Sequence, residues 1–300
     1  MKKLLITGAS GFLGWNLCQA ATQNWQVWGT YFSHQVNLPG INLVKIDLRD
    51  FSALQELFKT IQPDGVIHTA AASKPNFCQT NPELSYSINV TASLNIARLC
   101  ADRAIPCAFT STDLVFDGKN PVYQEDDPVS PICYYGEQKV TAENQMRSIY
   151  PAIAICRMPL MFGVASPVAD CFLQGMISNL KQGNSLNLFI DEYRTPASTK
   201  AASQGLLLAI KQQVSGIWHL GGKTRISRYD FGLLLADLLS ATPELIQPVK
   251  QEDVTMAAPR SPDTSLNSSK AFAIGYQPRS IREELTEILS MDNGQLQPIA

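Results

Sequence analysis

The chain has 300 residues, with 24 Lys and Arg against 26 Asp and Glu, which gives a net charge of −2. Such a chain produces no strong field to attract nucleic acid or an anionic membrane surface. Hydrophobic residues make up 45% and charged residues 17%. This composition is too apolar for a disordered chain, and no apolar run approaches the roughly 18 residues of a membrane helix. We expect a globular protein with no nucleic-acid or membrane partner.

The cysteines and the N-terminus favour the cytoplasm. The cysteines are odd in number and no pair has CxxC spacing, which fits neither a disulfide framework nor a zinc site. They are Cys18, Cys78, Cys100, Cys107, Cys133, Cys156 and Cys171. Lys2 and Lys3 precede an apolar stretch over 4–6, too short for the roughly 7–15 apolar residues of a signal peptide. We expect a cytoplasmic protein without a metal site.

Short apolar segments alternate with helical patterns over the first half of the chain. The expected strands are 2–7, 26–31, 42–46, 65–69, 105–111 and 152–157. The expected helices are 11–23, 51–61 with Asp50 as N-cap, 82–103 and 134–149. Repeated β-α units predict a parallel sheet with helices on both faces, and right-handed crossovers make it a doubly wound α/β fold of the Rossmann type.

The second half is less regular. Helices are expected at 170–181, 198–212, 228–239 and 280–289, a strand at 216–220, and mostly loop over 243–269. The late strand indicates that the chain returns to the first sheet. We expect a dinucleotide-binding domain over 1–160, rejoined by a strand near 216–221, and a smaller interleaved region over 161–300 that binds substrate.

The segment from Thr7 to Gly14 spaces three glycines as GxxGxxG between the first strand and the first helix. Gly8 permits a tight turn, Gly11 lets a pyrophosphate approach the backbone, and Gly14 allows close packing of helix on sheet. The helix N-terminus then offers unpaired N–H groups to phosphates. A glycine-rich turn that binds no ligand could have the same sequence, but the position of this segment between the first strand and the first helix favours a dinucleotide site. The predicted contacts are Gly8, Ser10, Gly11, Phe12, Leu13 and Gly14.

Two further strand ends support a dinucleotide. Asp47 and Leu48 end the third strand, where a carboxylate can bond the adenine amino group. An Asp after a strand is also a common turn or cap residue. Ala70, Ala71 and Ala72 end the fourth strand, where small side chains leave room for the cofactor ribose.

The end of the second strand favours NADP over NAD. An acidic residue there would hold the ribose 2′-hydroxyl of NAD, whereas a basic residue would favour the 2′-phosphate of NADP. No acid is present, and Ser33 and His34 can bond a phosphate. We expect NADP, with NAD possible.

Tyr135 and Lys139 share a helix face, because they are four residues apart in the segment 135–139. A nearby ammonium is expected to lower the phenol pKa, so that the phenol can donate a proton to a carbonyl oxygen as hydride arrives at carbon. Lys139 would also bond the nicotinamide ribose, so Tyr135 and Lys139 are predicted cofactor contacts as well. Tyr134 would point about 140° away from Lys139 around the helix, so Tyr135 is the expected proton donor. A solvated helix face is the alternative interpretation, and the glycine loop favours the catalytic one.

Ser111, Thr112 and Asp113 end the fifth strand. The carboxyl ends of strands in such sheets face the ligand crevice, so a hydroxyl there can align a substrate carbonyl with the tyrosine. A strand-end cap is the alternative.

These residues resemble the extended short-chain dehydrogenase/reductase superfamily and, within it, the dTDP-4-dehydrorhamnose reductase (RmlD-like) family. The similar segments are the glycine loop, 63–68, 111–118, 123–128, 135–139 and 260–267, with Lys270 following. The segments at 111–113 and 260–270 are the family-specific ones, whereas the pentad and the glycine loop belong to the whole superfamily.

The resemblance implies a reductase that moves hydride from NAD(P)H to the 4-keto carbon of a nucleotide-linked deoxysugar, as in dTDP-rhamnose biosynthesis. Thr112 would then bond the keto oxygen, Tyr135 would donate the proton, and Lys139 would assist it. The backbone near Pro159 would touch the nicotinamide. Asp113 and Arg260 would complete the substrate contacts.

Some residues depart from the family. Leu114 and Leu160 stand where the family has Tyr and often Trp, and Asp263 stands where Asn is usual. The stretch 72–89 is closer to the branch of the methionine adenosyltransferase regulatory β subunit, which binds a nucleotide cofactor and serves as a binding partner. A regulatory subunit and a nucleotide-sugar epimerase are therefore the alternatives, and the helix over 82–103 is a candidate homodimer surface.

Overall fold

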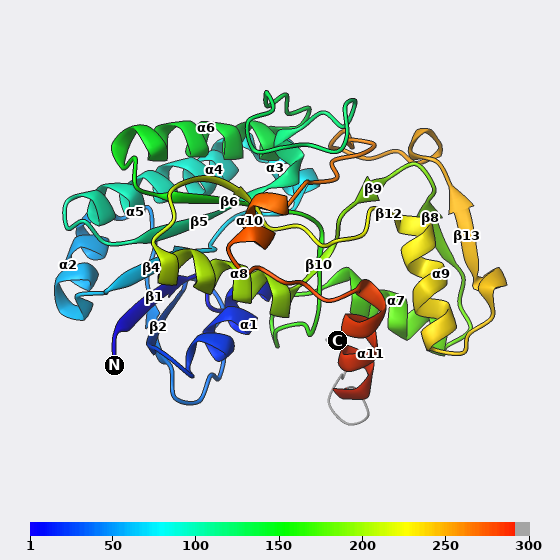
Figure 1. Cartoon of the computed structure of the whole chain (residues 1–300), viewed down its shortest axis with the longest axis horizontal. Coiled ribbons are helices and arrows are strands. Elements are labelled where there is room, and N and C mark those ends of the chain that lie inside the picture. The colour runs from blue at the N-terminus through cyan, green and yellow to red at the C-terminus, as the bar shows by residue number, and fades with distance from the viewer. Residues whose placement is uncertain (292–300) are drawn as a thin grey trace.

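A seven-stranded parallel sheet forms the centre of the molecule, and it confirms the predicted Rossmann-type α/β fold (Figure 1). The computed structural model describes residues 1–291. The strands run in the order β11-β6-β5-β4-β1-β2-β3, so the order reverses beside β1. They are β1 (Lys3–Thr7), β2 (Gln26–Tyr31), β3 (Asn42–Lys45), β4 (Gly65–His68), β5 (Cys107–Thr112), β6 (Ala154–Met158) and β11 (Gly216–His219).

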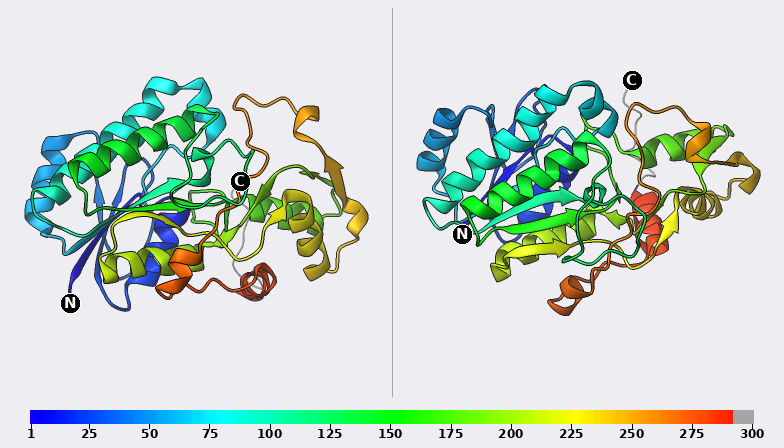
Figure 2. Two further views of the ribbon diagram at one scale, coloured as in Figure 1. Left: turned by 45° about the horizontal axis from the view of Figure 1, so that its top comes forward. Right: turned by 90° about the horizontal axis from the view of Figure 1, so that it is seen from above.

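Helices cover both faces of this sheet (Figures 1 and 2). Side chains alternate along β1, so that Leu4 and Ile6 enter one apolar cluster and Leu5 enters the other. The first cluster lies beneath α1 (Phe12–Ala21) and α8 (Thr199–Gln212). The second lies beneath α2 (Phe51–Ile61), α5 (Ala92–Ala101) and α6 (Tyr134–Ile149). Both faces are buried, which explains the continuous apolar strands of the first half.

The predicted helix over 82–103 is interrupted. It consists of α4 (Pro82–Tyr86), a π-helical turn over Ser87–Thr91 and α5, and it is preceded by an unpredicted helix α3 (Pro75–Thr80). Asn89 lies within the π turn, and its amide bonds both the N–H and the carbonyl of Ala72. This widened turn therefore anchors the loop after β4.

A smaller lobe forms the other end of the molecule, with its own apolar cluster (Figure 2). The expectation of mostly loop over 243–269 is wrong at β13 (Ile246–Val249), which pairs in parallel with β8 (Leu186–Phe189). Pro248 argues against a strand in the sequence. Both strands of a two-stranded sheet are edge strands, however, and proline is tolerated there. The helices of the lobe are α7 (Phe172–Lys181), α9 (Arg228–Leu238) and α11 (Ile281–Met291).

Several short elements complete the two parts of the molecule. They are β7 (Met161–Phe162) with β10 (Ala197–Ser198), β9 (Tyr193–Arg194) with β12 (Ile226–Ser227), α10 (Ser269–Ala273), and 3₁₀ turns at Asp113–Val115, Pro243–Leu245 and Gln251–Asp253. β11 pairs with β6, so the chain returns to the sheet after its first passage through the lobe. The predicted region 161–300 includes residues 292–300, which lie outside the described residues. Within residues 1–291, no helix combines the length and the apolar character that crossing a membrane requires.

We predict that Gly14→Ala destabilises the protein, because the added Cβ would lie 2.1 Å from the Gly8 carbonyl oxygen. Backbone must move, at a cost of about 1–3 kcal/mol in the free energy of unfolding. Gly175→Ala in α7 is the matched control, since its Cβ would meet nothing within 4 Å. There, alanine should stabilise by up to about 1 kcal/mol. Denaturant unfolding measures both, and equal effects would contradict the close approach of α1.

Candidate active site

A pocket of about 470 Å³ opens at the carboxyl ends of the sheet strands, beside the N-terminus of α1. Most of the predicted cofactor contacts line this pocket, although they come from five separate segments of the chain. Those that line it are Gly8, Ser10, Gly11, Phe12, Leu13, Gly14, Ser33, Asp47, Leu48, Ala70, Ala71, Tyr135 and Lys139. Thr112, Asp113, Pro159, Arg260, His34 and Ala72 lie outside this lining.

The glycine loop is held tightly against the end of β4. Gly8 has a φ of 73°, and a Cβ there would lie 2.8 Å from the Ala70 backbone. The Thr7 hydroxyl accepts hydrogen bonds from the backbone N–H groups of Thr69 and Ala70, at 3.2 and 3.3 Å. The N-cap of α1 is Gly11, which offers no side-chain cap. The first-turn N–H groups of α1 are thereby left to a ligand, and the loop fits a dinucleotide pyrophosphate.

A carboxylate–guanidinium pair lies at the other end of the pocket. Asp47 accepts bonds from Arg49 Nε at 2.9 Å and from Nη2 at 2.6 Å. These bonds lower the pKa of Asp47. The Arg49 guanidinium also lies 5.7 Å from the centre of the Phe32 ring, and both residues line the pocket beside Ser33. His34 is exposed and bonds only the Ser33 hydroxyl among the described residues.

Arg49 was not among the predicted contacts, because the prediction looked for a basic residue after the second strand. It comes instead from the end of β3, two residues beyond Asp47. Arg49 could have been found in the segment Asp47-Leu48-Arg49. Neighbouring parallel strands end at the same edge of a sheet, so a basic residue after the third strand can reach the same site as one after the second. Met158 and Met161 also line the pocket without having been predicted, and they flank the buried Pro159.

Tyr135 and Lys139 project from the first two turns of α6 to the floor of the pocket. Both are buried, with 8% and 1% of their surface exposed, whereas the neighbouring Tyr134 is 40% exposed. Lys139 Nζ donates to the Thr110 carbonyl at 2.8 Å and lies 4.4 Å from the centre of the Phe109 ring. The ammonium is 5.9 Å from the centre of the Tyr135 ring. One helix face therefore carries a phenol and an amine into one pocket.

The expectation that the ammonium lowers the phenol pKa is wrong for this structure. Burial raises the pKa of Tyr135 well above 10, with further increases from Cys78, Asp113 and Cys133, while a hydrogen bond with Thr112 opposes them. Burial lowers the pKa of Lys139 to about 7. Loss of water around the buried pair disfavours both charged forms, the phenolate and the ammonium. The phenol is consequently held protonated, the state that a proton donor needs.

The end of β5 lies beside this pair. Thr112 is buried, and its hydroxyl accepts from the Leu114 N–H at 3.2 Å and donates to Asp113 at 3.2 Å. Asp113 is engaged within the protein, by the Thr264 hydroxyl at 2.8 Å and by Arg194 at 3.3 Å. Burial raises the pKa of Asp113, and Arg194 opposes that. Asp113 thus joins the sheet to the lobe through two buried partners.

Three arginines gather where the lobe meets the sheet. Burial lowers the pKa of Arg228, Glu192 opposes this, and the charges of Arg194 and Arg260 lower it further. Arg228 Nη1 and Arg260 Nε are buried and have no hydrogen-bond partner within the described residues. Arg228 also lies 4.2 Å from the centre of the Phe172 ring. Arg194 pairs with Asp113 and Glu192, so the N–H groups left to bind an anion are those of Arg228 and Arg260.

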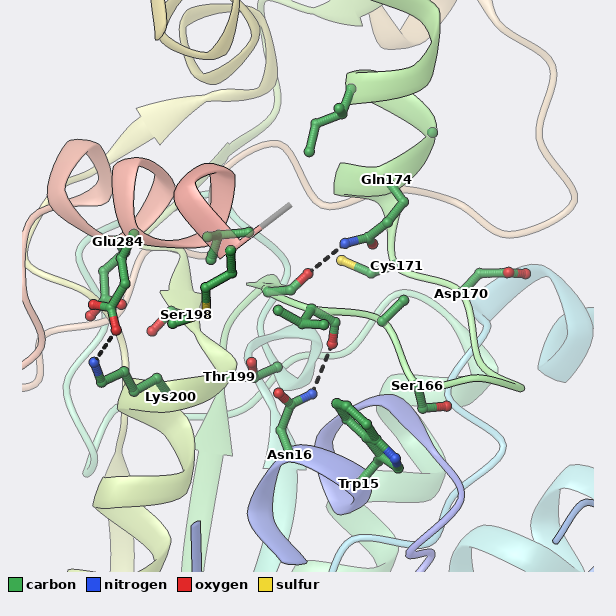
Figure 3. A pocket seen from close by; sticks show the side chains of 18 of the residues that line it. Trp15, Asn16, Ser166, Asp170, Cys171, Gln174, Ser198, Thr199, Lys200 and Glu284 are labelled. Atoms are coloured by element: carbon green, nitrogen blue, oxygen red, sulfur yellow. Dashed lines mark hydrogen bonds and ion pairs between the residues drawn. The ribbon is translucent and has the colours of Figure 1, made fainter. Parts of the chain in front are cut away.

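A larger cavity, of about 1330 Å³, lies between α1, α7, α8 and α11, and no predicted site residue lines it (Figure 3). Several of its polar side chains bond protein groups. Asn16 donates to the Val164 carbonyl at 2.9 Å, Gln174 donates to the Gly163 carbonyl at 2.8 Å, and Lys200 pairs with Glu287. The smaller pocket, which holds Tyr135 and Lys139, is therefore the candidate active site.

A family model described as the RmlD substrate binding domain matches residues 1–293. The chain belongs to the RmlD substrate-binding domain family. This result supports the resemblance seen in the sequence motifs.

Known relatives of this RmlD-family chain are similar along nearly their whole length. The probable low-salt glycan biosynthesis reductase Agl14 of Haloferax volcanii is 31% identical over 94% of this chain and 96% of the relative. The methionine adenosyltransferase 2 subunit beta of Xenopus laevis is 28% identical, over 96% and 88%. The crystal structure of dTDP-4-dehydrorhamnose reductase from Bacillus anthracis in complex with NADP superposes with a TM-score of 0.86, at 22% identity, over 97% and 100%. That likeness shows the common fold.

The lowered pKa of Lys139 predicts a pH-dependent stability in this RmlD-family chain. Between about pH 7 in the folded chain and ~10.4 in the unfolded chain, only the unfolded chain holds the proton. The free energy of unfolding should therefore rise with pH there, by up to about 1.4 kcal/mol per unit. Lys139→Met lacks this rise and should be more stable than the wild type at pH 7, by a margin that shrinks towards pH 9.

Denaturant unfolding at several pH values measures this margin. Lys59→Met, at an exposed lysine of α2, serves as the control, and its margin should stay constant with pH. A margin for Lys139→Met that does not change between pH 7 and 9 would contradict the lowered pKa.

Proposed function

We propose that the chain is an NADPH-preferring reductase that transfers hydride to the 4-keto carbon of a nucleotide-linked deoxysugar. The observation that carries this proposal is that Tyr135 and Lys139 lie in the same pocket as the glycine loop. A proton donor and a dinucleotide cradle in one pocket are what carbonyl reduction requires. The similarity to a glycan biosynthesis reductase supports the same class of reaction.

The chain's own residues supply binding and proton transfer. The first turn of α1 and the glycine loop would hold the pyrophosphate, and the bound NADPH supplies the hydride. Tyr135 donates the phenolic proton to the keto oxygen. Thr112, which directly follows the pocket residue Ser111, would orient that oxygen once its hydroxyl turns from Asp113 to the substrate. Lys139 stabilises the phenolate left after proton transfer, at a distance that its Thr110 hydrogen bond fixes.

The preference for NADP rests on Arg49. Its guanidinium faces the pocket beside Ser33, where the ribose 2′-phosphate of NADP would lie, and a guanidinium is the side chain best suited to a phosphate. A solved structure of the same fold contains NADP. Asp47 holds the guanidinium in place and leaves its remaining N–H groups to the ligand.

The arginines at the lobe support a nucleotide-linked substrate. A nucleotide sugar carries a diphosphate, and the unpartnered N–H groups of Arg228 and Arg260 offer it charge-assisted hydrogen bonds. Binding of this anion would also relieve the repulsion among the arginines. Leu114 and Leu160 replace aromatic residues of the family, so we propose the class of substrate and not a particular sugar.

The direct test is a panel of nucleotide-4-ketosugars with NADPH and NADH, followed by the absorbance of the reduced nicotinamide. Tyr135→Phe should lower turnover by a factor of at least about 100, since the proton donor is lost, while NADPH affinity stays within about threefold. Tyr134→Phe, which removes an exposed hydroxyl next to it, should retain full turnover. Turnover that survives in Tyr135→Phe would contradict the assigned role.

We predict that Arg49→Ala changes the choice of dinucleotide. NADPH affinity should fall at least about tenfold, the value of one charge-assisted hydrogen bond, while NADH affinity stays the same or improves because Asp47 becomes free. Arg98→Ala, at an exposed position of α5, is the control. Fluorescence titration with each dinucleotide measures the ratio, and an equal loss for both would contradict a 2′-phosphate contact.

A regulatory subunit is the second candidate function. The similarity to the methionine adenosyltransferase 2 subunit beta covers 96% of this chain and favours it. Tyr135 and Lys139 favour the enzyme instead, because a binding partner needs no proton donor. Co-purification with a partner enzyme, together with no reduction of any ketosugar in the panel, would establish the regulatory function.

A further inference from the structure

The face of α6 that carries Tyr135 and Lys139 continues one turn further to Glu143. The three residues are four positions apart, so their side chains lie in one row along the helix. Glu143 is as deeply buried as Lys139, with 2% of its surface exposed. A carboxylate at this depth requires partners, and those of Glu143 lie on the sheet.

The Glu143 carboxylate joins the ends of β5 and β6. Its Oε1 accepts from the Ser111 hydroxyl at 2.5 Å and from Arg157 Nε at 3.1 Å, and its Oε2 accepts from Arg157 Nη2 at 2.8 Å. Ser111 lines the cofactor pocket and immediately precedes Thr112. The carboxylate therefore holds the strand end that presents the Thr112 hydroxyl.

Lys139 and Glu143 act on consecutive residues of the same strand. Lys139 Nζ bonds the carbonyl of Thr110, and Glu143 bonds the side chain of Ser111. Two successive turns of one helix thus fix Thr110 and Ser111, the two residues that precede Thr112 at the end of β5. Glu143 does not line the pocket, so it reaches neither the cofactor nor the substrate directly.

We propose that Glu143 is a positioning residue of this site, which fixes the end of β5 through Ser111 and places a carboxylate one helical turn from Lys139. This inference rests on the proposed function, because it concerns the same pocket. Tyr135 and Lys139 would touch the reactants, whereas Glu143 would act only through its neighbours.

The charges around Lys139 support this role. Burial lowers the pKa of Lys139 to about 7, while Glu143 and, to a smaller extent, Cys78 oppose that shift. The groups that face Lys139 are Tyr135 and Glu143 on α6, His68 on β4, Cys78 on α3 and, across Glu143, Arg157 on β6. Burial lowers the pKa of His68 to about 3, so its ring is neutral. Removal of the Glu143 charge would leave Lys139 and Arg157 as buried cations without this anion.

The test measures NADPH affinity of the full chain from pH 5 to 9, by the fluorescence of the reduced nicotinamide. Affinity of the wild type should fall as Lys139 loses its proton. Glu143→Gln should move the midpoint of that fall to lower pH by about one unit or more. Glu143→Asp keeps the charge and should leave the midpoint within about 0.3 units. Glu284→Gln is the matched control and should leave the midpoint unchanged, since Glu284 is also buried but lies on α11, outside the pocket that holds Lys139.

A double variant assigns the midpoint to Lys139. Lys139→Met should abolish the fall in affinity, and the addition of Glu143→Gln should produce no further pH dependence. An unmoved midpoint in Glu143→Gln, or a midpoint in Glu143→Asp displaced by a full unit, overturns the positioning role. The Asp variant decides alone if Glu143→Gln does not fold.

The outcomes separate this role from the proposed function. A wild-type chain that binds no NADPH overturns the proposed function, and the role of Glu143 with it. A wild-type chain that binds NADPH with a midpoint indifferent to Glu143 overturns only the positioning role.

Discussion

The hydrogen bond from the Lys139 ammonium to the Thr110 carbonyl determines where the reactive face of α6 meets the sheet. It ties the second turn of the helix to the end of β5, and so places Tyr135, one turn earlier, at the floor of the pocket. The bond lies within the fold rather than at its surface, where desolvation strengthens it and also makes the ammonium costly. The pocket therefore contains the Lys139 amine, whose pKa burial lowers to about 7, and the Tyr135 phenol, which burial keeps neutral.

The rest of the site follows from two close approaches. α1 packs on the glycine loop so tightly that no side chain fits at Gly14, and the first-turn N–H groups of α1 consequently face the pocket. At the opposite end, β3 brings Arg49 beside Phe32. A ligand in this pocket meets the first-turn N–H groups of α1, the Arg49 guanidinium and the Tyr135 phenol. This arrangement fits a phosphorylated dinucleotide whose reactive ring lies beside Tyr135.

Much of the architecture could be predicted from the sequence, because burial on both faces of a parallel sheet leaves a strong apolar pattern. The first strand, Asp50 as the N-cap of α2, and the helix that carries Tyr135 are all confirmed. β13 could not be predicted, since Pro248 removes the usual strand signal. The π turn at Asn89 depends on a tertiary contact with Ala72, which no local pattern reveals. The direction of the Tyr135 pKa was missed for a similar reason: spacing places a cation nearby, but only the fold determines how much water is lost.

A crystal structure of the chain with NADPH tests the central claim most directly. The account predicts the pyrophosphate at the first turn of α1 and the nicotinamide beside Tyr135, with the phenolic oxygen facing the ring carbon that carries the hydride. A nicotinamide bound elsewhere, or a Tyr135 hydroxyl turned into the core, would contradict it.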